Sequence, residues 1–156
     1  MPLTDELLAH CPYAPDAVFI DEIVEMDKQA GRIVLRVPTR ADMPLVCHQR
    51  VHPTRHPAHM AGGLLIHITG MAGYVFGHEI LGLRGADGWV VFGGALHDVR
   101  FHSLAFIGPP LFFEGQSIEV RRHEHKVGVR FQSRFTQNEK LVYEGEQTAV
   151  FVNTPD

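Results

Sequence analysis

One segment of this chain constrains the fold more than any other: from His56 to His78 there is no Asp, Glu, Lys or Arg. A segment of that length could span a lipid bilayer. It also contains four histidines, Thr69 and five glycines, and strand-like segments flank it on both sides, which is typical of a helix buried in a protein core. We therefore expect one long buried helix over Met60–Leu83 and no association with a membrane.

Glycines recur along this predicted helix at positions 63, 70, 73 and 77. The spacings of seven, three and four residues place them along one face, where another backbone can approach closely. An interior glycine costs about 1 kcal/mol relative to alanine in a helix. Close packing must offset that cost, so we expect the helix to lie against a neighbouring structural element.

After Arg84 the hydrophobic pattern changes to a period of two, which is typical of strands. The alternation is clearest at Lys126–Thr136, where apolar residues occupy one face and polar residues the other. A bulge is expected at Gly93-Gly94, because glycines inside a strand often mark one. The predicted strands are Val18–Glu25, Arg32–Val37, Trp89–Phe101, Leu111–His123, Lys126–Thr136 and Leu141–Val152, and a short helix is predicted at Thr4–Ala9.

The order of these elements is two strands, one long helix and then long strands joined by short turns, which favours antiparallel pairing. An apolar sheet face needs a cover, and the long helix is the only candidate. We predict an α+β fold in which an antiparallel sheet wraps around one central helix, as a single domain of residues 1–156. Because the helix is apolar nearly all round, a homodimer is expected to cover its far side.

The charge balance argues against one class of partner. Lys and Arg total 14 and Asp and Glu total 18, which gives a formal net charge of −4 without any basic stripe. Nucleic acid is therefore not an expected partner, because phosphate contacts need clustered cations. Two cysteines, Cys11 and Cys47, are too few for a disulfide scaffold. Together with an acidic N-terminus that lacks the pattern of a signal peptide, this predicts a cytoplasmic protein.

Four motifs resemble, in their order and spacing, those of the 3-hydroxyacyl-ACP dehydratases. The motifs are Ala17–Glu25 (AVFIDEIVE), His52-Pro53 with Pro57, Met60–His67 (MAGGLLIH), and Arg100-Phe101 with Gly108 and Leu111. They are similar to that family's opening strand, its His-Phe-Pro-x-x-Pro, its helix start Met-Pro-Gly-Val-Leu-Leu-x-Glu, and its Arg-Phe followed by Pro-Gly-Asp-x-Leu. The resemblance covers roughly residues 12–152. It implies a hotdog fold and action on an acyl thioester, carried by acyl carrier protein (ACP) or coenzyme A (CoA).

The resemblance also implies a pair of catalytic residues from opposite protomers. In the family a histidine removes the proton alpha to the thioester, and a helix acid protonates the leaving hydroxyl. His52 resembles the base, but His67 stands where the family has the acid. A buried neutral imidazole donates a proton only weakly, so dehydration is chemically handicapped. One extra residue lies between His52 and Met60, so His56 or His59 could take the place of the base.

Thioester hydrolysis is the alternative reaction. The start of the predicted helix offers free backbone N–H groups at Gly62 and Gly63 for a developing oxyanion. His67, or His59 just before the helix, could act as general base on a water molecule. We predict Met60, Gly62 and Gly63 as substrate-binding residues, with the acyl chain in a tunnel beside the helix.

A third interpretation involves no catalysis. His67 could be a structural histidine bonded to a backbone carbonyl, and the protein would then bind acyl groups without converting them.

Metal binding is a further alternative for the histidine-rich loop. Its candidate ligands are Cys47, His48, His52, His56 and His59. However, Pro53 and Pro57 interrupt any helix that would align the histidines, and the run lacks Asp and Glu. We therefore expect neither a metal nor another cofactor.

Overall fold

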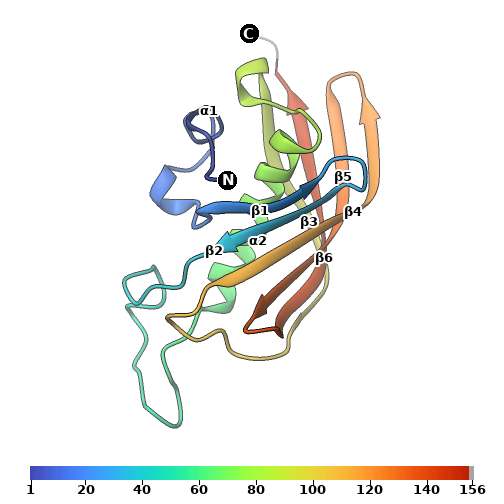
Figure 1. Ribbon diagram of the computed structural model, residues 1–156. Helices are drawn as coiled ribbons and strands as arrows, with labels where there is room; N and C mark the ends of the chain where they lie inside the picture. The colour runs from blue at the N-terminus through green and yellow to red at the C-terminus, as the bar shows by residue number, and fades with distance from the viewer. Residues whose placement is uncertain (155–156) are drawn as a thin grey trace.

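The computed structural model describes residues 1–154 of the chain (Figure 1). The helices are α1 (Asp5–Ala9), the short 3-10 helix η1 (Pro15–Ala17), α2 (Gly62–Glu79) and the short 3-10 helix η2 (Gly85–Asp87). The strands are β1 (Glu22–Asp27), β2 (Arg32–Val37), β3 (Trp89–Phe101), β4 (Leu111–His123), β5 (Lys126–Gln137) and β6 (Lys140–Asn153).

The six strands form one antiparallel sheet in the order β1-β2-β4-β5-β6-β3. Figure 1 shows the long helix α2 along one face of this curved sheet. The predicted arrangement, an antiparallel sheet with one long helix against it, is confirmed. The strand β3 lies at one edge, so one side of its backbone has no partner strand among residues 1–154.

The core forms between α2 and the inner face of the sheet. The strand β5 alternates between buried and exposed positions, as its sequence predicts, and directs Val127, Val129, Phe131 and Phe135 inward. The ring of Phe76 on α2 stacks on Phe131 with the ring centroids 5.8 Å apart. A methyl group at Gly77 would lie 2.2 Å from the Phe151 ring, so this glycine lets the helix approach the sheet closely.

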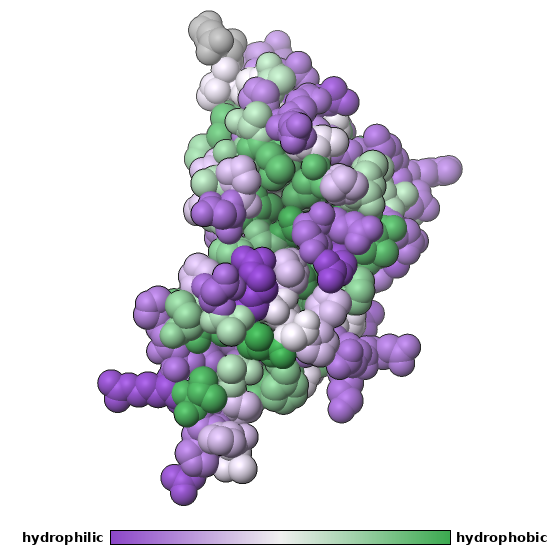
Figure 2. Space-filling model, turned by 60° about the vertical axis from the view of Figure 1, so that its left-hand side comes forward, coloured by the Kyte–Doolittle hydropathy of each residue, from purple (hydrophilic) through white to green (hydrophobic). Residues whose placement is uncertain are grey.

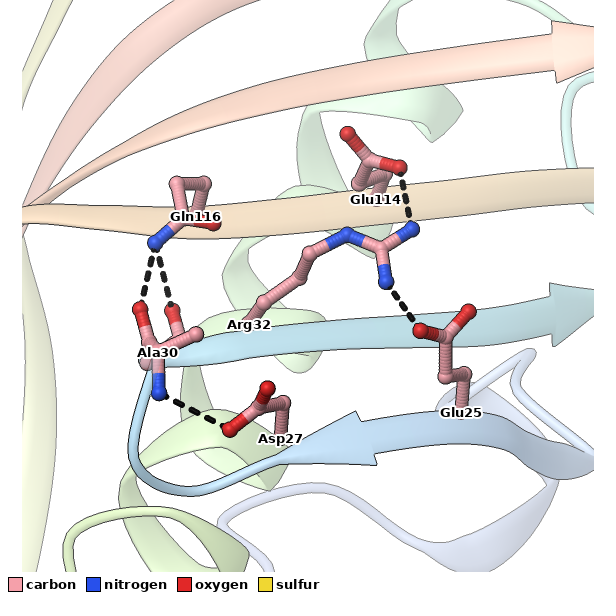
Figure 3. A network of polar contacts seen from close by, with 7 residues as sticks. Glu25, Asp27, Ala30, Arg32, Glu114 and Gln116 are labelled. Atoms are coloured by element: carbon pink, nitrogen blue, oxygen red, sulfur yellow. Dashed lines mark hydrogen bonds and ion pairs between the residues drawn. The ribbon is translucent and has the colours of Figure 1, made fainter.

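The outer face of β1, β2 and β4 carries a network of charged side chains. Arg32 on β2 forms ion pairs with Glu25 on β1 and with Glu114 on β4 (Figure 3). The hydrogen bonds to Glu114 and Glu25 raise the pKa of the Arg32 guanidinium. Such exposed pairs contribute little free energy each, and they mark this face as the solvent side of the sheet.

Several element boundaries differ from the sequence prediction. The helix α2 runs over Gly62–Glu79 rather than Met60–Leu83, and Gly82 turns the chain with a φ of +69°. The first strand begins at Glu22 rather than at Val18. Before it, the 3-10 helix η1 and a φ of +57° at Phe19 prevent an extended chain, although Val18 is buried. The apolar pattern there indicates burial rather than strand structure.

The bulge predicted at Gly93-Gly94 is present on β3, between Gly93 and Ala95. It shifts the register so that Gly93 pairs with Ala149 but Leu96 pairs with Gln147. A side chain at Gly94 would come within 3.0 Å of the Thr148 carbonyl oxygen, which explains the glycine there. Within residues 1–154, no helix has both the length and the hydropathy that crossing a membrane requires.

Candidate functional site

A cavity of about 670 Å³ lies between α2, the edge strand β3 and the N-terminal segment. Its walls are mostly apolar, and the residues that line it include no Asp, Glu, Lys or Arg. The polar side chains among them are Tyr13, His67, Gln147 and Thr148. Two lining glycines, Gly70 on α2 and Gly93 on β3, have nothing within 4 Å of the position where a Cβ would lie. The cavity is therefore shaped to hold an uncharged, largely apolar group.

His67 is the basic side chain in this cavity. Its Nε2–H donates to the backbone oxygen of Ala17 at 2.7 Å. The Tyr13 and Phe19 rings meet the imidazole edge-on, with centroids 4.8 and 5.8 Å away. The bond to Ala17 fixes the tautomer of the neutral ring, so Nδ1 carries the lone pair and has no partner among residues 1–154. His67 is thus held as a proton acceptor, although the partner that orients it is a carbonyl and not an acid.

One side of α2 is left uncovered near its N-terminus. Gly63 and Gly70 are exposed and His67 is half-buried, and their spacing of four and three residues puts all three on the same face. Toward the other end, Tyr74 continues this face but is buried, and its hydroxyl donates to the Leu7 carbonyl at 2.7 Å. The N-terminal segment therefore closes the open face beyond Gly70.

The start of α2 has the features expected of an anion site. The backbone N–H groups of Gly62 and Gly63 have no acceptor among the described residues. A side chain at Gly62 would lie 3.1 Å from the Phe101 ring, whereas at Gly63 the nearest atom would be Leu45 Cδ1 at 3.8 Å. Gly63 precedes His67 by about 6 Å along the helix axis, at 1.5 Å per residue. Met60 is 2% exposed. None of Met60, Gly62 and Gly63 lines the cavity, so the role of all three in binding stays a prediction.

His52 is not among the residues that line the cavity beside His67. It is exposed in the loop before α2, where its backbone pairs with that of His56. Its Nδ1 accepts hydrogen bonds from the backbone N–H groups of Thr54 and Arg55, at 3.3 and 3.1 Å. Neutral His52 therefore carries its proton on Nε2, and its lone pair is already used. This tautomer suits a hydrogen-bond donor rather than the base that the sequence predicts.

His59 is held more firmly than His52. Its backbone pairs with Phe106, and the Gln49 side chain bonds to both its N–H and its carbonyl. The His59 Nδ1–H donates to the Pro57 carbonyl at 2.8 Å, so Nε2 carries the lone pair. Neither His52 nor His59 lines the cavity, and no three His, Cys, Asp or Glu side chains within residues 1–154 are grouped closely enough to hold a metal ion.

Sequence reasoning missed Gln147. It lies on β6, in a strand that alternates between buried and half-buried positions, and occupies a buried position beside the cavity. The available signal was the alternation itself, because it assigns Gln147 and the apolar Ala149 and Phe151 to the same inner face.

No protein-family model matches the chain, but solved structures resemble it. The dehydratase heterocomplex ApeI:P from Xenorhabdus doucetiae matches with a TM-score of 0.68 and 12% identity, over 100% of this chain and 92% of that one. A thioesterase from Haemophilus influenzae matches with a TM-score of 0.63 and 16% identity, over 100% and 95%. A hypothetical thioesterase from Streptococcus pneumoniae, in a structure with coenzyme A, matches with a TM-score of 0.58 and 11% identity, over 86% and 88%.

The chain is a hotdog-fold protein, as the sequence motifs predict. The similar structures include both dehydratases and thioesterases, and their low identities show a shared fold without selecting a reaction.

Proposed function

We propose that this protein hydrolyses acyl thioesters, with His67 as the general base. The observation that carries the proposal is the hydrogen bond from His67 Nε2–H to Ala17 O, which leaves Nδ1 as an acceptor in an apolar cavity. A base held in this tautomer is ready to accept a proton from water. The neutral ring has no proton to give on that side, which is what dehydration would require of it.

The reaction follows from the layout of the open face of α2. The thioester carbonyl lies at the Gly62 and Gly63 N–H groups, and the acyl chain runs past His67 into the cavity. His67 Nδ1 takes a proton from water, whose oxygen bonds to the carbonyl carbon, and the helix N-terminus stabilises the oxyanion. The C–S bond then breaks, and the imidazolium returns the proton to the departing thiolate. The uncharged cavity suits the acyl group, and the charged carrier, CoA or ACP, stays outside.

Dehydration of a 3-hydroxyacyl thioester is the second candidate. It is favoured by the similarity to the ApeI:P dehydratase, which extends over the whole of this chain. The motifs imply His52 as the base and residue 67 as the acid, but the tautomers suit the opposite roles. His67 would be the base, and the Nε2–H of His52 from a second copy would donate the proton to the leaving hydroxyl. A neutral imidazole is a weak acid, so this arrangement gives a slower reaction than a carboxylic acid would.

A product assay separates the candidates. We would incubate the protein with a 3-hydroxyacyl-CoA and follow the products by mass spectrometry. Free hydroxy acid and CoA, lost in His67→Gln but kept in His52→Ala, are the expected result. An enoyl-CoA product that is lost both in His67→Gln and in His52→Ala would establish the dehydratase instead. Unchanged substrate across several chain lengths would leave an acyl-binding protein.

A homodimer that covers the open edge completes the proposal. Apolar residues of β3 are exposed: Val90, Phe92, Leu96 and Phe101. Figure 2 shows hydrophobic residues gathered in the middle of one face, between hydrophilic ones. An unpaired edge strand with apolar side chains favours pairing with a second copy. We expect sedimentation equilibrium to give twice the chain mass, and Phe92→Lys to weaken association; a monomer at all concentrations would contradict the dimer.

A further inference from the structure

Gln147 is a buried polar side chain that the proposed hydrolysis does not use. It lies on the inner face of β6, opposite Phe131 on β5 and Leu96 on β3, and is 7% exposed. Its Nε2–H donates to the backbone oxygen of Thr69 on α2 at 2.8 Å. This bond orients the amide, so that Oε1 is the atom left for another partner.

The amide oxygen faces the cavity. Oε1 accepts no hydrogen bond from residues 1–154. Within that range, the side-chain polar atoms that are both fully enclosed and unpartnered are His78 Nε2 and Ser133 Oγ. Gln147 Oε1 is not one of them, so it keeps contact with open space. Because Gln147 lines the cavity and is otherwise buried, that space is the cavity.

An amide oxygen at an apolar wall costs free energy unless it accepts a hydrogen bond. The walls near it include Met71, Leu96 and Ala149, which offer no donor from their side chains. We propose that the acyl group bound in this cavity carries a hydroxyl group, which donates a hydrogen bond to Gln147 Oε1. The inference rests on the proposed function, because it specifies which acyl thioesters the His67 site receives.

The place of Gln147 along α2 determines where that hydroxyl lies on the acyl chain. Its amide is bonded to Thr69, and a side chain at Gly73 would lie 3.1 Å from its Nε2. A thioester carbonyl at Gly63 would be about 9 Å from Thr69 and about 15 Å from Gly73 along the helix, at 1.5 Å per residue. A hydroxyl on the third carbon is too close to the carbonyl to span either distance. A hydroxyl near the end of a medium-length chain can reach Gln147.

The test compares decanoyl-CoA, ω-hydroxydecanoyl-CoA and 3-hydroxydecanoyl-CoA as substrates, and measures Kd for decanoate and ω-hydroxydecanoate. We expect the wild-type protein to favour the ω-hydroxylated compound about tenfold, in kcat/KM and in Kd, because the unhydroxylated chain leaves Oε1 unpaired. The 3-hydroxyl should give no such preference. Gln147→Met should remove the preference by weakening only the ω-hydroxylated compound, and Gln132→Met, on the exposed face of β5, should keep it.

Two outcomes overturn the inference: equal affinity of the wild-type protein for the plain and ω-hydroxylated compounds, or an unchanged preference in Gln147→Met. The wild-type comparison decides the matter even if Gln147→Met does not fold. Turnover of thioesters without the preference would leave the hydrolase standing and reject the hydroxylated ligand. A preference between the free acids without turnover of any thioester would support the hydroxylated ligand and reject the hydrolase.

Discussion

Gly77 and Gly70 lie two turns apart on α2 and meet opposite surroundings. A methyl group at Gly77 would collide with the Phe151 ring at 2.2 Å, whereas at Gly70 it would meet nothing within 4 Å. The first glycine brings the helix against the sheet, and the second leaves room in the cavity. Both glycines lie on the same face of the helix, so the same residue type serves tight packing against the sheet toward the C-terminal end of α2 and open space beside the cavity nearer its N-terminal end.

The difference explains how one helix can serve both stability and binding. On the sheet side, the stacked rings of Phe76 and Phe131 anchor the core. On the open side, His67 is oriented by the loop carbonyl of Ala17 and keeps Nδ1 available. A change at a position that contacts the sheet should therefore alter folding first, and a change at a position beside the cavity should alter function first.

The largest expected effect is on the open side. We expect His67→Gln to lower kcat for thioester hydrolysis by about 10²- to 10⁴-fold, because an amide cannot take the proton from water. The stability should change little, since glutamine can still donate to the Ala17 carbonyl. Steady-state kinetics and urea unfolding measure the two effects.

The matched control for this experiment is His102→Gln. His102 is exposed and pairs with Glu144 on the sheet, outside the cavity lining. The His102→Gln variant should keep kcat within a factor of about two of the wild-type value. Equal losses in His67→Gln and His102→Gln would show that neither histidine is the base.

The largest loss of stability is expected where Gly77 contacts the sheet. Gly77→Ala places a methyl group against the buried Phe151 ring, and overpacking of this kind costs about 1–3 kcal/mol. The better helix propensity of alanine offsets up to about 1 kcal/mol of that cost. We expect a net decrease of about 1–2 kcal/mol in the free energy of unfolding, measured by urea denaturation. A more stable Gly77→Ala protein would mean that the ring moves aside without cost.

Periodicity predicted the fold well, because it reports which face of an element is buried. The bounds of β2, β3 and β4 agree with the sequence prediction, as does the bulge at Gly93. The first strand was misplaced because the buried residues before it lie in a loop, where apolar side chains follow no period. The ends of α2 were overextended for a similar reason, since apolar residues continue beyond the helix.

The site was less predictable, because it depends on contacts between distant segments. His67 could be singled out from its motif, but its partner Ala17 lies 50 residues earlier in the chain. The structural interpretation of His67, a bond to a backbone carbonyl, describes that contact correctly, and the bond also orients the ring as a base. The tautomer of His52 depends on the turn formed by Thr54 and Arg55, which no spacing rule reveals.

Tyr74 marks the point where the open face of α2 becomes closed. Burial raises the pKa of its phenol from about 10 to about 12. Folding favours the protonated phenol. Its contribution to the free energy of unfolding is therefore complete below pH 10 and is lost as the pH rises from 10 to 12. We expect Tyr74→Phe to lower the free energy of unfolding by about 1 kcal/mol at neutral pH, because the hydrogen bond to Leu7 is lost. Between pH 10 and pH 12 this variant should lose less stability than the wild type.

Urea unfolding of Tyr74→Phe and the wild type at several pH values checks this. Burial also raises the pKa of Tyr143, but this group is present in both proteins and cancels in the comparison. Cys11 does not cancel in the same way, because its charge contributes to the raised pKa of Tyr74. Parallel pH profiles would show that Tyr74 ionises without disturbing the fold.

The smallest expected effect is also the sharpest test of the open side. Gly70→Ala should raise the free energy of unfolding by up to about 1 kcal/mol, because alanine favours the helix and its methyl group enters empty space. One methyl group takes little of a 670 Å³ cavity, so kcat/KM should change less than threefold, about the size of a 0.6 kcal/mol effect. Urea unfolding of Gly70→Ala and Gly77→Ala, each measured against the wild type, compares the two positions directly. A loss of stability that grows with protein concentration would instead show a second copy packed against Gly70, and the open face would then belong to the dimer interface rather than to the substrate.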